Sequence, residues 1–395
     1  MRRVALAAAF VVASCHTSPP APQREPIQVA AAASLGFDSA GLAAVASYVA
    51  SQVDSAYPGA VVAVGRHGRL ALLAAAGHYG VDDPRPVDPA TIYDLASLTK
   101  VIGLTTACLL LVDEGKLDLE APVRAYLPEF QGPGKDRVTI RHLLTHSSGL
   151  PAWRPLFKDA ATRVAALALV DTTPLSLTPG DSFIYSDLGA ITLAQVVERI
   201  AGEPLDTFLA RRVFEPLDMT STRYLPPQGW RLRIAPTERD TVFRRRMMHG
   251  EVHDENAGRL GGVSGHAGLF SNAPDLALFA TWLLAARSGL ARPGLTPHSE
   301  TVVRFTTRQN LPPGSSRALG WDTPSQPSSA GTRLSEHAFG HTGFTGTSIW
   351  IDPEQDLFVI LLTNRVHPTR ANTRIMRVRP RVADLVVEAL VDRGP

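Results

Sequence analysis

The sequence predicts an α/β fold of the α+β type. In this fold an antiparallel β-sheet from the N- and C-terminal segments is flanked by helices, and a mostly helical domain is inserted between them. Strand-like apolar runs occur near the N-terminus and return after residue 317, whereas helical spacing dominates the residues between. The length of 395 residues is enough for such a core. We therefore expect one domain over residues 37–395, with a sheet part at about 37–130 and 300–395 and a helical part at about 131–299.

The first elements are predicted as a helix and a hairpin. Residues 38–56 place an apolar side chain at helical intervals, at Leu42, Val45, Val49 and Val53. The stretch GAVVAVGRHGRLALLAAAGHYG predicts two strands around a turn at residues 66–68. The apolar stretch that follows Ser97 predicts a helix of roughly 16 residues that ends at Gly115.

Later elements follow the same reasoning. Helical patterns cover residues 188–201 and 275–288. Strand patterns then return in ALGWDT, GTSIWIDP and DLFVILLTN, and a last amphipathic helix is predicted over residues 381–390. The arginine-rich stretch RIMRVRPR just before that helix is interpreted as a solvated face.

The N-terminus predicts export. Arg2 and Arg3 precede a short apolar run, and the small residues that follow end at Cys15. The run is too short for a membrane-spanning helix, which needs about 20 residues, and its end resembles a bacterial lipobox. We expect a lipoprotein signal peptide at 1–15, lipidation of Cys15 and a Pro/Ala-rich tether at 16–36; an ordinary signal peptide cut nearby is the alternative. The protein would then be lipid-anchored to a bacterial cell membrane, facing the periplasm in a Gram-negative organism.

The composition excludes several classes of binding partner and cofactor. A net charge of +2 gives no reason to expect nucleic-acid binding, and two cysteines suggest neither a disulfide framework nor a zinc site. The residues of HGEVHDENAG, together with His266, include metal-binding types but lack H-E-x-x-H spacing. We expect this segment to form a loop over a pocket and to bind no metal. We also expect that the protein has no cofactor and is a monomer.

Ser97 and Lys100 are the first candidate for chemistry. They lie one helical turn apart at the head of an apolar stretch, so both face the same side. Ser97 would sit at the positive end of a helix, and burial of Lys100 would lower its pKa and allow it to take the serine proton. The alternative is a helix N-cap serine followed by a lysine that reaches solvent.

Two further segments favour catalysis. Tyr185, Ser186 and Asp187 precede a predicted helix, and His341, Thr342 and Gly343 lie on a predicted strand. The order S-L-T-K, Y-S-D, H-T-G resembles the three motifs of penicillin-recognising serine hydrolases. Together with IRHLLTHSSGLP and GEVHDENAGRLGGVSGHAGLFSNAPDLALFA, it is similar to the class C β-lactamase-type family, which includes DD-peptidases and esterases, and to the penicillin-binding protein 4B type in particular.

The resemblance implies a role for each matching residue. It makes Ser97 the nucleophile, and Lys100 and Tyr185 the groups that manage its proton, in an order the sequence leaves open. The backbone N–H groups of Ser97 and Phe344 would form the oxyanion hole. The substrate-binding residues would be Asp187, His341, Thr342, Gly343 and Phe344.

The chain departs from the family pattern at three positions. Asp187 stands where asparagine is frequent, and a carboxylate there would raise rather than lower the pKa of Lys100. His341 replaces the lysine that meets a substrate carboxylate, and Asn372 falls where class C β-lactamases carry an arginine, with Arg370 and Arg374 nearby. We expect His341 to read a carboxylate only as it becomes protonated at lower pH.

The combined prediction is a serine hydrolase that forms an acyl-enzyme at Ser97. Cell-wall D-alanyl peptides are the favoured substrates, which makes the protein similar to a DD-carboxypeptidase and penicillin-binding. An esterase for small acyl esters and a weak β-lactamase are alternatives. A non-catalytic wall-binding lipoprotein is the alternative from another class, which the intact S-L-T-K and Tyr185 disfavour.

Overall fold

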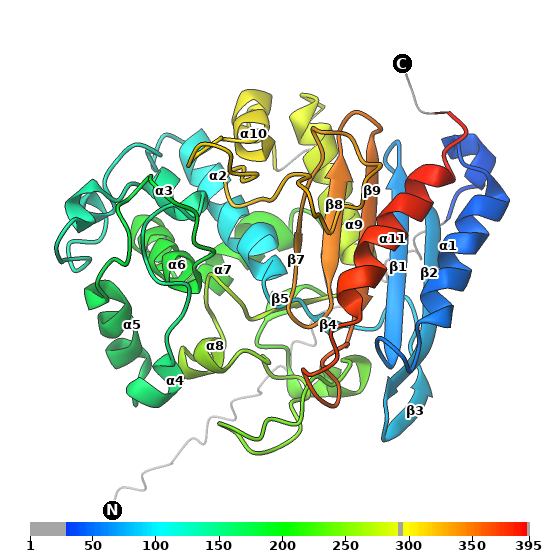
Figure 1. Cartoon of the computed structure of the whole chain (residues 1–395), viewed down its shortest axis with the longest axis horizontal. Coiled ribbons are helices and arrows are strands. Elements are labelled where there is room, and N and C mark those ends of the chain that lie inside the picture. The colour runs from blue at the N-terminus through cyan, green and yellow to red at the C-terminus, as the bar shows by residue number, and fades with distance from the viewer. Residues whose placement is uncertain (1–28, 291–294, 393–395) are drawn as a thin grey trace, which may run out of the picture.

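The main sheet joins the two ends of the chain. The structure, a computed structural model, describes residues 29–290 and 295–392. Six antiparallel strands run in the order β3-β2-β1-β9-β8-β7, and the pairing of β1 with β9 places early and late segments side by side (Figure 1). The strands are β1 (Gly59–Arg66), β2 (Arg69–Gly80), β3 (Asp83–Pro86), β7 (Phe339–Thr342), β8 (Ser348–Asp352) and β9 (Leu357–Thr363). The predicted fold class is confirmed.

Helices cover both faces of this sheet. They are α1 (Ser39–Ser51) and α11 (Ile375–Glu388) on one face and α9 (Ala273–Arg287) on the other. Along β1, Val62 belongs to the core under α1 and α11, and its neighbour Val61 belongs to the core that contains α9. Because both faces are buried, the strand has a continuous apolar sequence instead of an alternating one. Helix α9 was expected in the helical part, but it packs on β1 and β9.

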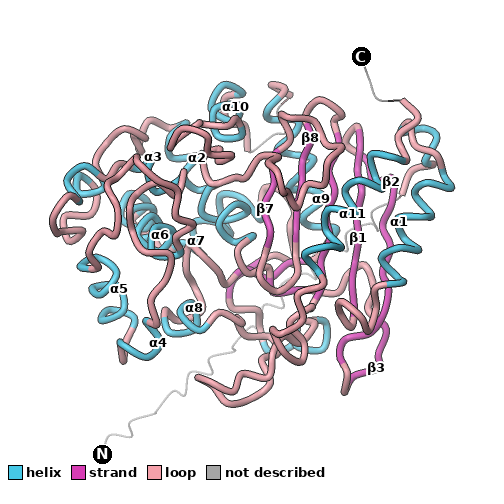
Figure 2. Tube along the Cα trace, viewed as in Figure 1, coloured by secondary structure: helices cyan, strands magenta, loops and turns pink. Residues whose placement is uncertain are grey.

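The rest of the chain forms the helical part, beside the β7 edge of the sheet (Figure 2). Its helices are α2 (Thr106–Asp113), α3 (Ile140–Leu144), α4 (Leu156–Asp159), α5 (Arg163–Thr172), α6 (Asp187–Ala201), α7 (Leu205–Leu209), α8 (Glu255–Arg259) and α10 (Ser299–Thr306). A second small sheet has the order β4 (Tyr93–Asp94), β6 (Leu269–Ser271), β5 (Arg223–Tyr224). Strand β4 leads directly into the segment that carries Ser97.

Three predicted elements differ from the structure. ALGWDT is a turn, because Gly320 has a φ of 81° and the N–H of Ala318 bonds back to the carbonyl of Trp321. Helix α11 begins at Ile375, ahead of the predicted start, and contains Pro380. The described end of the predicted tether is also packed: Ala30 donates a hydrogen bond to Leu70, and Leu35 is buried.

The remaining predictions about the N-terminus concern residues that the structure does not describe. The signal peptide and Cys15 lie outside the described residues. Within the described part of the chain, every helix falls short of the length and apolar character that crossing a membrane requires. The other cysteine, Cys108, is buried with a free thiol.

Candidate active site

A strained turn presents Ser97. The residue before it, Ala96, has a φ of 46°, in the left-handed region that is unfavourable for alanine. The buried carboxylate of Asp94 stabilises this turn, because it accepts hydrogen bonds from the N–H of Ala96 at 2.8 Å and of His253 at 2.7 Å. Burial raises the pKa of Asp94. The N–H of Ser97 itself has no hydrogen-bond partner among the described residues, so it remains available to a ligand.

Lys100 is buried against Ser97. Its Nζ lies 2.9 Å from Ser97 Oγ, 3.2 Å from the carbonyl oxygen of His266 and 2.7 Å from Asp187 Oδ1. Burial alone would lower the pKa of Lys100, but Asp187 and then Tyr185 outweigh it and raise the pKa above its ordinary value. Lys100 is therefore an ammonium ion, not the neutral base that the apolar stretch suggested. The expectation that a carboxylate at position 187 would raise this pKa is confirmed.

The backbone around Lys100 is unusual. Residues Lys100–Thr105 form a π-helical turn that continues into α2. Such turns are uncommon and occur frequently at functional sites. The predicted helix from Ser97 to Gly115 is thus present, with its first turn wider than that of an α-helix.

Tyr185 lies in a row of aromatic rings. Its ring centre is 4.6 Å from that of His146, 5.8 Å from that of His341 and 4.8 Å from Lys100 Nζ. Burial lowers the pKa of His146 well below 6.5, so it is neutral, and its Nδ1 accepts a hydrogen bond from the N–H of Ser186. His146 therefore helps to fix Tyr185, a role that the sequence did not reveal because THSSGLP was interpreted only as part of the family resemblance.

His341 lies on the edge strand β7, as predicted, but it is not a cation. It is buried, and its Nδ1 donates to the carbonyl oxygen of Thr342 at 2.8 Å. Burial, together with the charges of Arg317 and Lys100, lowers its pKa well below 6.5. Its Nε2 has no hydrogen-bond partner among the described residues and is an acceptor in this tautomer. The protonation that the predicted binding of a carboxylate by His341 requires is therefore shifted to a lower pH than for an ordinary histidine.

The turn after β7 is attached to the turn before Ser97. Thr345 Oγ1 donates to the carbonyl oxygen of Asp94 at 2.7 Å, and Thr347 Oγ1 donates to that of Leu95 at 3.0 Å. Gly343 fits between these segments and donates its N–H to the carbonyl oxygen of Thr347 at 2.7 Å. The N–H of Phe344 has no partner among the described residues. Two free N–H groups, of Ser97 and Phe344, are thus held on segments that are bonded to each other.

These residues line one cavity of about 580 Å³. Ser97, Tyr185, His341, Thr342, Gly343 and Phe344 all contribute to its wall, as do the arginines Arg317, Arg365, Arg370 and Arg379. Five of the predicted residues thus lie on the pocket wall together with Ser97, while Lys100 and Asp187 are not among its lining residues. The sequence did not indicate Arg317 or Arg379 as pocket residues, because neither belongs to one of the catalytic motifs.

Arg317 is the cation in this wall with the fewest partners. Its guanidinium lies 5.1 Å from the ring centre of Phe183 and 5.5 Å from that of Tyr185. Its Nε is 3.7 Å from Asp322 Oδ1, beyond hydrogen-bond distance, and neither Nε nor Nη1 has a hydrogen-bond partner among the described residues. A mostly buried guanidinium whose Nε and Nη1 lack hydrogen-bond acceptors is costly, so this group is available to bind an anion.

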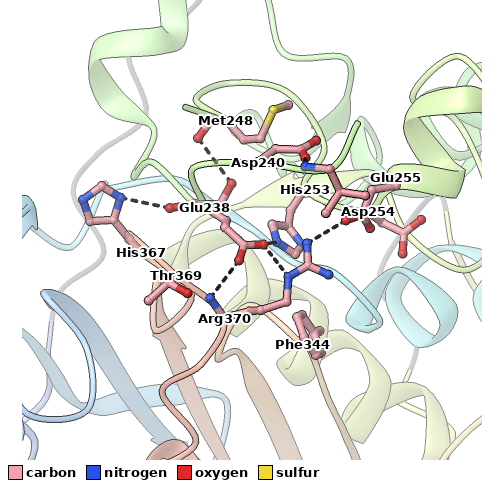
Figure 3. A network of polar contacts seen from close by, with 12 residues as sticks. Glu238, Asp240, Met248, His253, Asp254, Glu255, Phe344, His367, Thr369 and Arg370 are labelled. Carbon is pink, nitrogen blue, oxygen red and sulfur yellow. Dashed lines mark hydrogen bonds and ion pairs between the residues drawn. The ribbon is translucent and has the colours of Figure 1, made fainter. Parts of the chain in front are cut away.

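Arg370, which lies near the position of the family arginine, is already paired. Figure 3 shows it between Glu238 and Glu255, and its Nη2 lies 2.6 Å from Glu255 Oε1. Burial would raise the pKa of Glu238, but hydrogen bonds from His253 and Arg370 lower it to about 2. His253 stacks on Phe344 at a ring distance of 5.7 Å, so the histidine-rich segment supports a residue of the pocket wall, but no residue of the segment lines the pocket itself.

Asn372, at the position of the family arginine, and the nearby Arg374 also bond elsewhere. Asn372 Nδ2 and Arg374 Nη1 both donate to the carbonyl oxygen of Ser55. Among the described residues, one group has donors close enough for a metal, formed by Asp187, Asp254 and His266. Its members already pair, Asp187 with Lys100 and Asp254 with His266 at 2.8 Å.

The fold and this arrangement define a serine hydrolase of the β-lactamase type. The sequence model of the Beta-lactamase family matches residues 44–383, and the chain belongs to that family. It is 34% identical over 367 residues to a Bacillus subtilis protein named N-acetylmuramyl-L-alanine amidase, covering 84% of this chain and 82% of the relative. It is 32% identical over 378 residues to a putative D-alanyl-D-alanine carboxypeptidase of Salmonella agona, covering 86% of each.

Solved structures agree on the fold. A hydrolase with promiscuous acyltransferase activity, EstCE1, superposes with a TM-score of 0.69 at 23% identity, over 88% of this chain and 99% of its own. A penicillin-binding protein homologue from Caulobacter crescentus has a TM-score of 0.69 at 20% identity, over 89% of this chain and 99% of its own. At these identities the likeness concerns architecture alone.

Proposed function

We propose that the protein forms an acyl-enzyme at Ser97 and acts on peptidoglycan D-alanyl peptides, as a DD-carboxypeptidase does. The observation that carries the proposal is the contact of Ser97 Oγ with Lys100 Nζ at 2.9 Å, beside two free N–H groups. The intact pair also argues against a non-catalytic wall-binding protein. The name of the Salmonella relative supports this substrate class.

The proton of Ser97 requires an acceptor other than Lys100, because Lys100 is already protonated. We assign that role to the side-chain oxygen of Tyr185, whose ring centre lies 4.8 Å from Lys100 Nζ. Ser97 Oγ then bonds to the peptide carbonyl carbon while its proton passes to Tyr185. The C–N bond to the terminal D-alanine breaks, its nitrogen takes that proton, and water later hydrolyses the ester.

Arg317 favours substrates with a carboxylate over neutral esters. It supplies, from another segment, the fixed charge that His341 lacks. A hydrogen bond between an arginine guanidinium and a substrate carboxylate contributes about 1.5–3 kcal/mol to binding, which corresponds to roughly 10- to 100-fold in affinity.

The test of this proposal is substrate preference. Arg317→Gln should lower acylation by a D-alanyl-D-alanine peptide and by penicillin about 10- to 100-fold, with little effect on a neutral p-nitrophenyl ester. Because His341 stays neutral, the penicillin-to-ester ratio should be flat from about pH 6 to 8.5. Arg374→Gln, on an exposed arginine bonded to Ser55, is the control. If Arg317→Gln lowers the rate of acylation by both kinds of substrate equally, or if the unaltered enzyme releases no D-alanine, the esterase hypothesis is favoured instead.

We further propose that Cys15 is lipidated and anchors the exported protein to the membrane. The apolar run before VASC and the charged residues at the N-terminus support this. Cys15→Ser should move the protein from the membrane fraction to the soluble fraction after export. Retention of the variant in membranes after a high-salt wash would contradict the anchor.

We also propose that the protein is a monomer, since Ser97, Lys100 and Tyr185, the residues assigned to acylation, contact one another within one chain. Light scattering after size-exclusion chromatography should give the mass of a single chain in detergent-free, anchor-less protein. A stable multiple of that mass would contradict it.

A further inference from the structure

Two buried arginines hold the backbone on either side of the free N–H of Phe344. Arg379 reaches from α11, and its Nη2 donates to the carbonyl oxygens of Gly343 at 2.5 Å and Thr347 at 2.9 Å. Arg365 donates from Nε to the carbonyl oxygen of Phe344 at 2.7 Å. Arg379 is 6% exposed, so its guanidinium acts on these carbonyls from within the protein.

The carbonyl of Gly343 and the N–H of Phe344 belong to one peptide group. Because that group is planar, fixing its oxygen also fixes the direction of its N–H, on the opposite side. A cation hydrogen-bonded to the oxygen also polarises the peptide and strengthens the N–H as a donor. Both effects act on the group that would face the oxyanion of an acyl-transfer reaction.

The need of these backbone carbonyl groups for a hydrogen-bond donor does not by itself explain why Arg379 is buried here. The carbonyl of Gly343 already accepts a hydrogen bond from the N–H of Gly346 at 3.0 Å. The Nε of Arg379 has no hydrogen-bond partner among the described residues, so burial of this cation is only partly compensated. Burial and the charge of Arg365 lower the pKa of Arg379 to about 9, which still leaves it charged at pH 7.

We propose that Arg379 is a positioning residue of the oxyanion hole, which orients and polarises the Gly343–Phe344 peptide so that the N–H of Phe344 stabilises the tetrahedral intermediate at Ser97. The inference rests on the proposed acyl-enzyme, and it assigns a function to an arginine that the sequence placed on a solvated face. That interpretation of RIMRVRPR is wrong for Arg379, because the residue is buried.

The test compares an ester with its thionoester, in which the developing charge falls on sulfur, a weak hydrogen-bond acceptor. Arg379→Met should lower kcat for acylation by the oxygen ester about 10- to 100-fold, a fraction of the loss of a whole oxyanion donor, with KM changed little. The ester-to-thionoester rate ratio should fall about 10-fold with it. Arg379→Lys, which keeps the charge but has one donor atom to serve both carbonyls, should give an intermediate ratio. Arg381→Met is the control, since Arg381 lies on the same helix and pairs with Glu388 near solvent.

The outcomes separate the two proposals. If both substrates slow equally in the Arg379 variants, or the ratio equals that of the unaltered enzyme, Arg379 has only a structural role and the inference is overturned while acylation of Ser97 stands. If Arg379→Met fails to fold, the ratio in Arg379→Lys decides in the same way. If the unaltered enzyme forms no acyl-enzyme at Ser97, both proposals fall.

Discussion

Replacement of Lys100 by methionine is expected to lower the rate of Ser97 acylation by about 10³-fold, within the range for loss of a group that directs proton transfer. The variant removes the ammonium that lies 2.9 Å from Ser97 Oγ and beside the ring of Tyr185. It also leaves Asp187 without its ion-pair partner, so the melting temperature should fall. Stopped-flow acylation by an activated ester measures the first effect, and thermal unfolding measures the second.

A second variant separates these two effects. Lys100→Met combined with Asp187→Asn removes the unpaired carboxylate and should recover stability, but not acylation. Lys116→Met is the control, because Lys116 pairs with Glu114 at the surface. Acylation of the single variant within about 10-fold of the unaltered enzyme would show that Lys100 has no direct part in proton transfer.

Replacement of Gly343 by alanine is expected to lower kcat about 10²- to 10³-fold, the usual loss when one oxyanion donor is removed. A Cβ at this position would lie 2.1 Å from Thr347 Oγ1 and 2.3 Å from the carbonyl oxygen of Leu95, distances that neither atom allows. The turn must then move away from the segment before Ser97, and the N–H of Phe344 moves with it. Single-turnover acylation by the activated ester measures this loss.

The matched control is Gly229→Ala, where a Cβ meets no atom within 4 Å. It should leave acylation unchanged. A folded Gly343→Ala protein that acylates at the rate of the control would mean that the N–H of Phe344 does not stabilise the oxyanion.

The sequence predicted the sheet well because its strands are locally distinctive. The run GAVVAVGR is apolar at every position except its end, as expected of a strand buried on both faces, and β1 is buried throughout. The family motifs likewise mark short segments at the ends of regular elements. The structure brings Ser97, Lys100, Tyr185 and Asp187 together, as their order in the motifs implied.

The errors share a physical cause, which is that long-range contacts decide them. ALGWDT has an acceptable strand pattern, but the N–H of Gly320 bonds to Leu144, and the turn there places Arg317 on the pocket wall. In the sequence, Arg379 resembles a surface arginine beside a proline. The carbonyl groups that accept its hydrogen bonds lie far away in the sequence, in the turn after β7. His341 could not be recognised as neutral without knowledge of its burial and of the cations around it.

Intact-protein mass spectrometry after incubation with a fluorophosphonate shows whether Ser97 is the nucleophile. We expect a single adduct that maps to Ser97, is absent in Ser97→Ala and persists in Ser148→Ala and Ser182→Ala. An adduct that maps to another residue, or that remains in Ser97→Ala, would contradict an acyl-enzyme at Ser97.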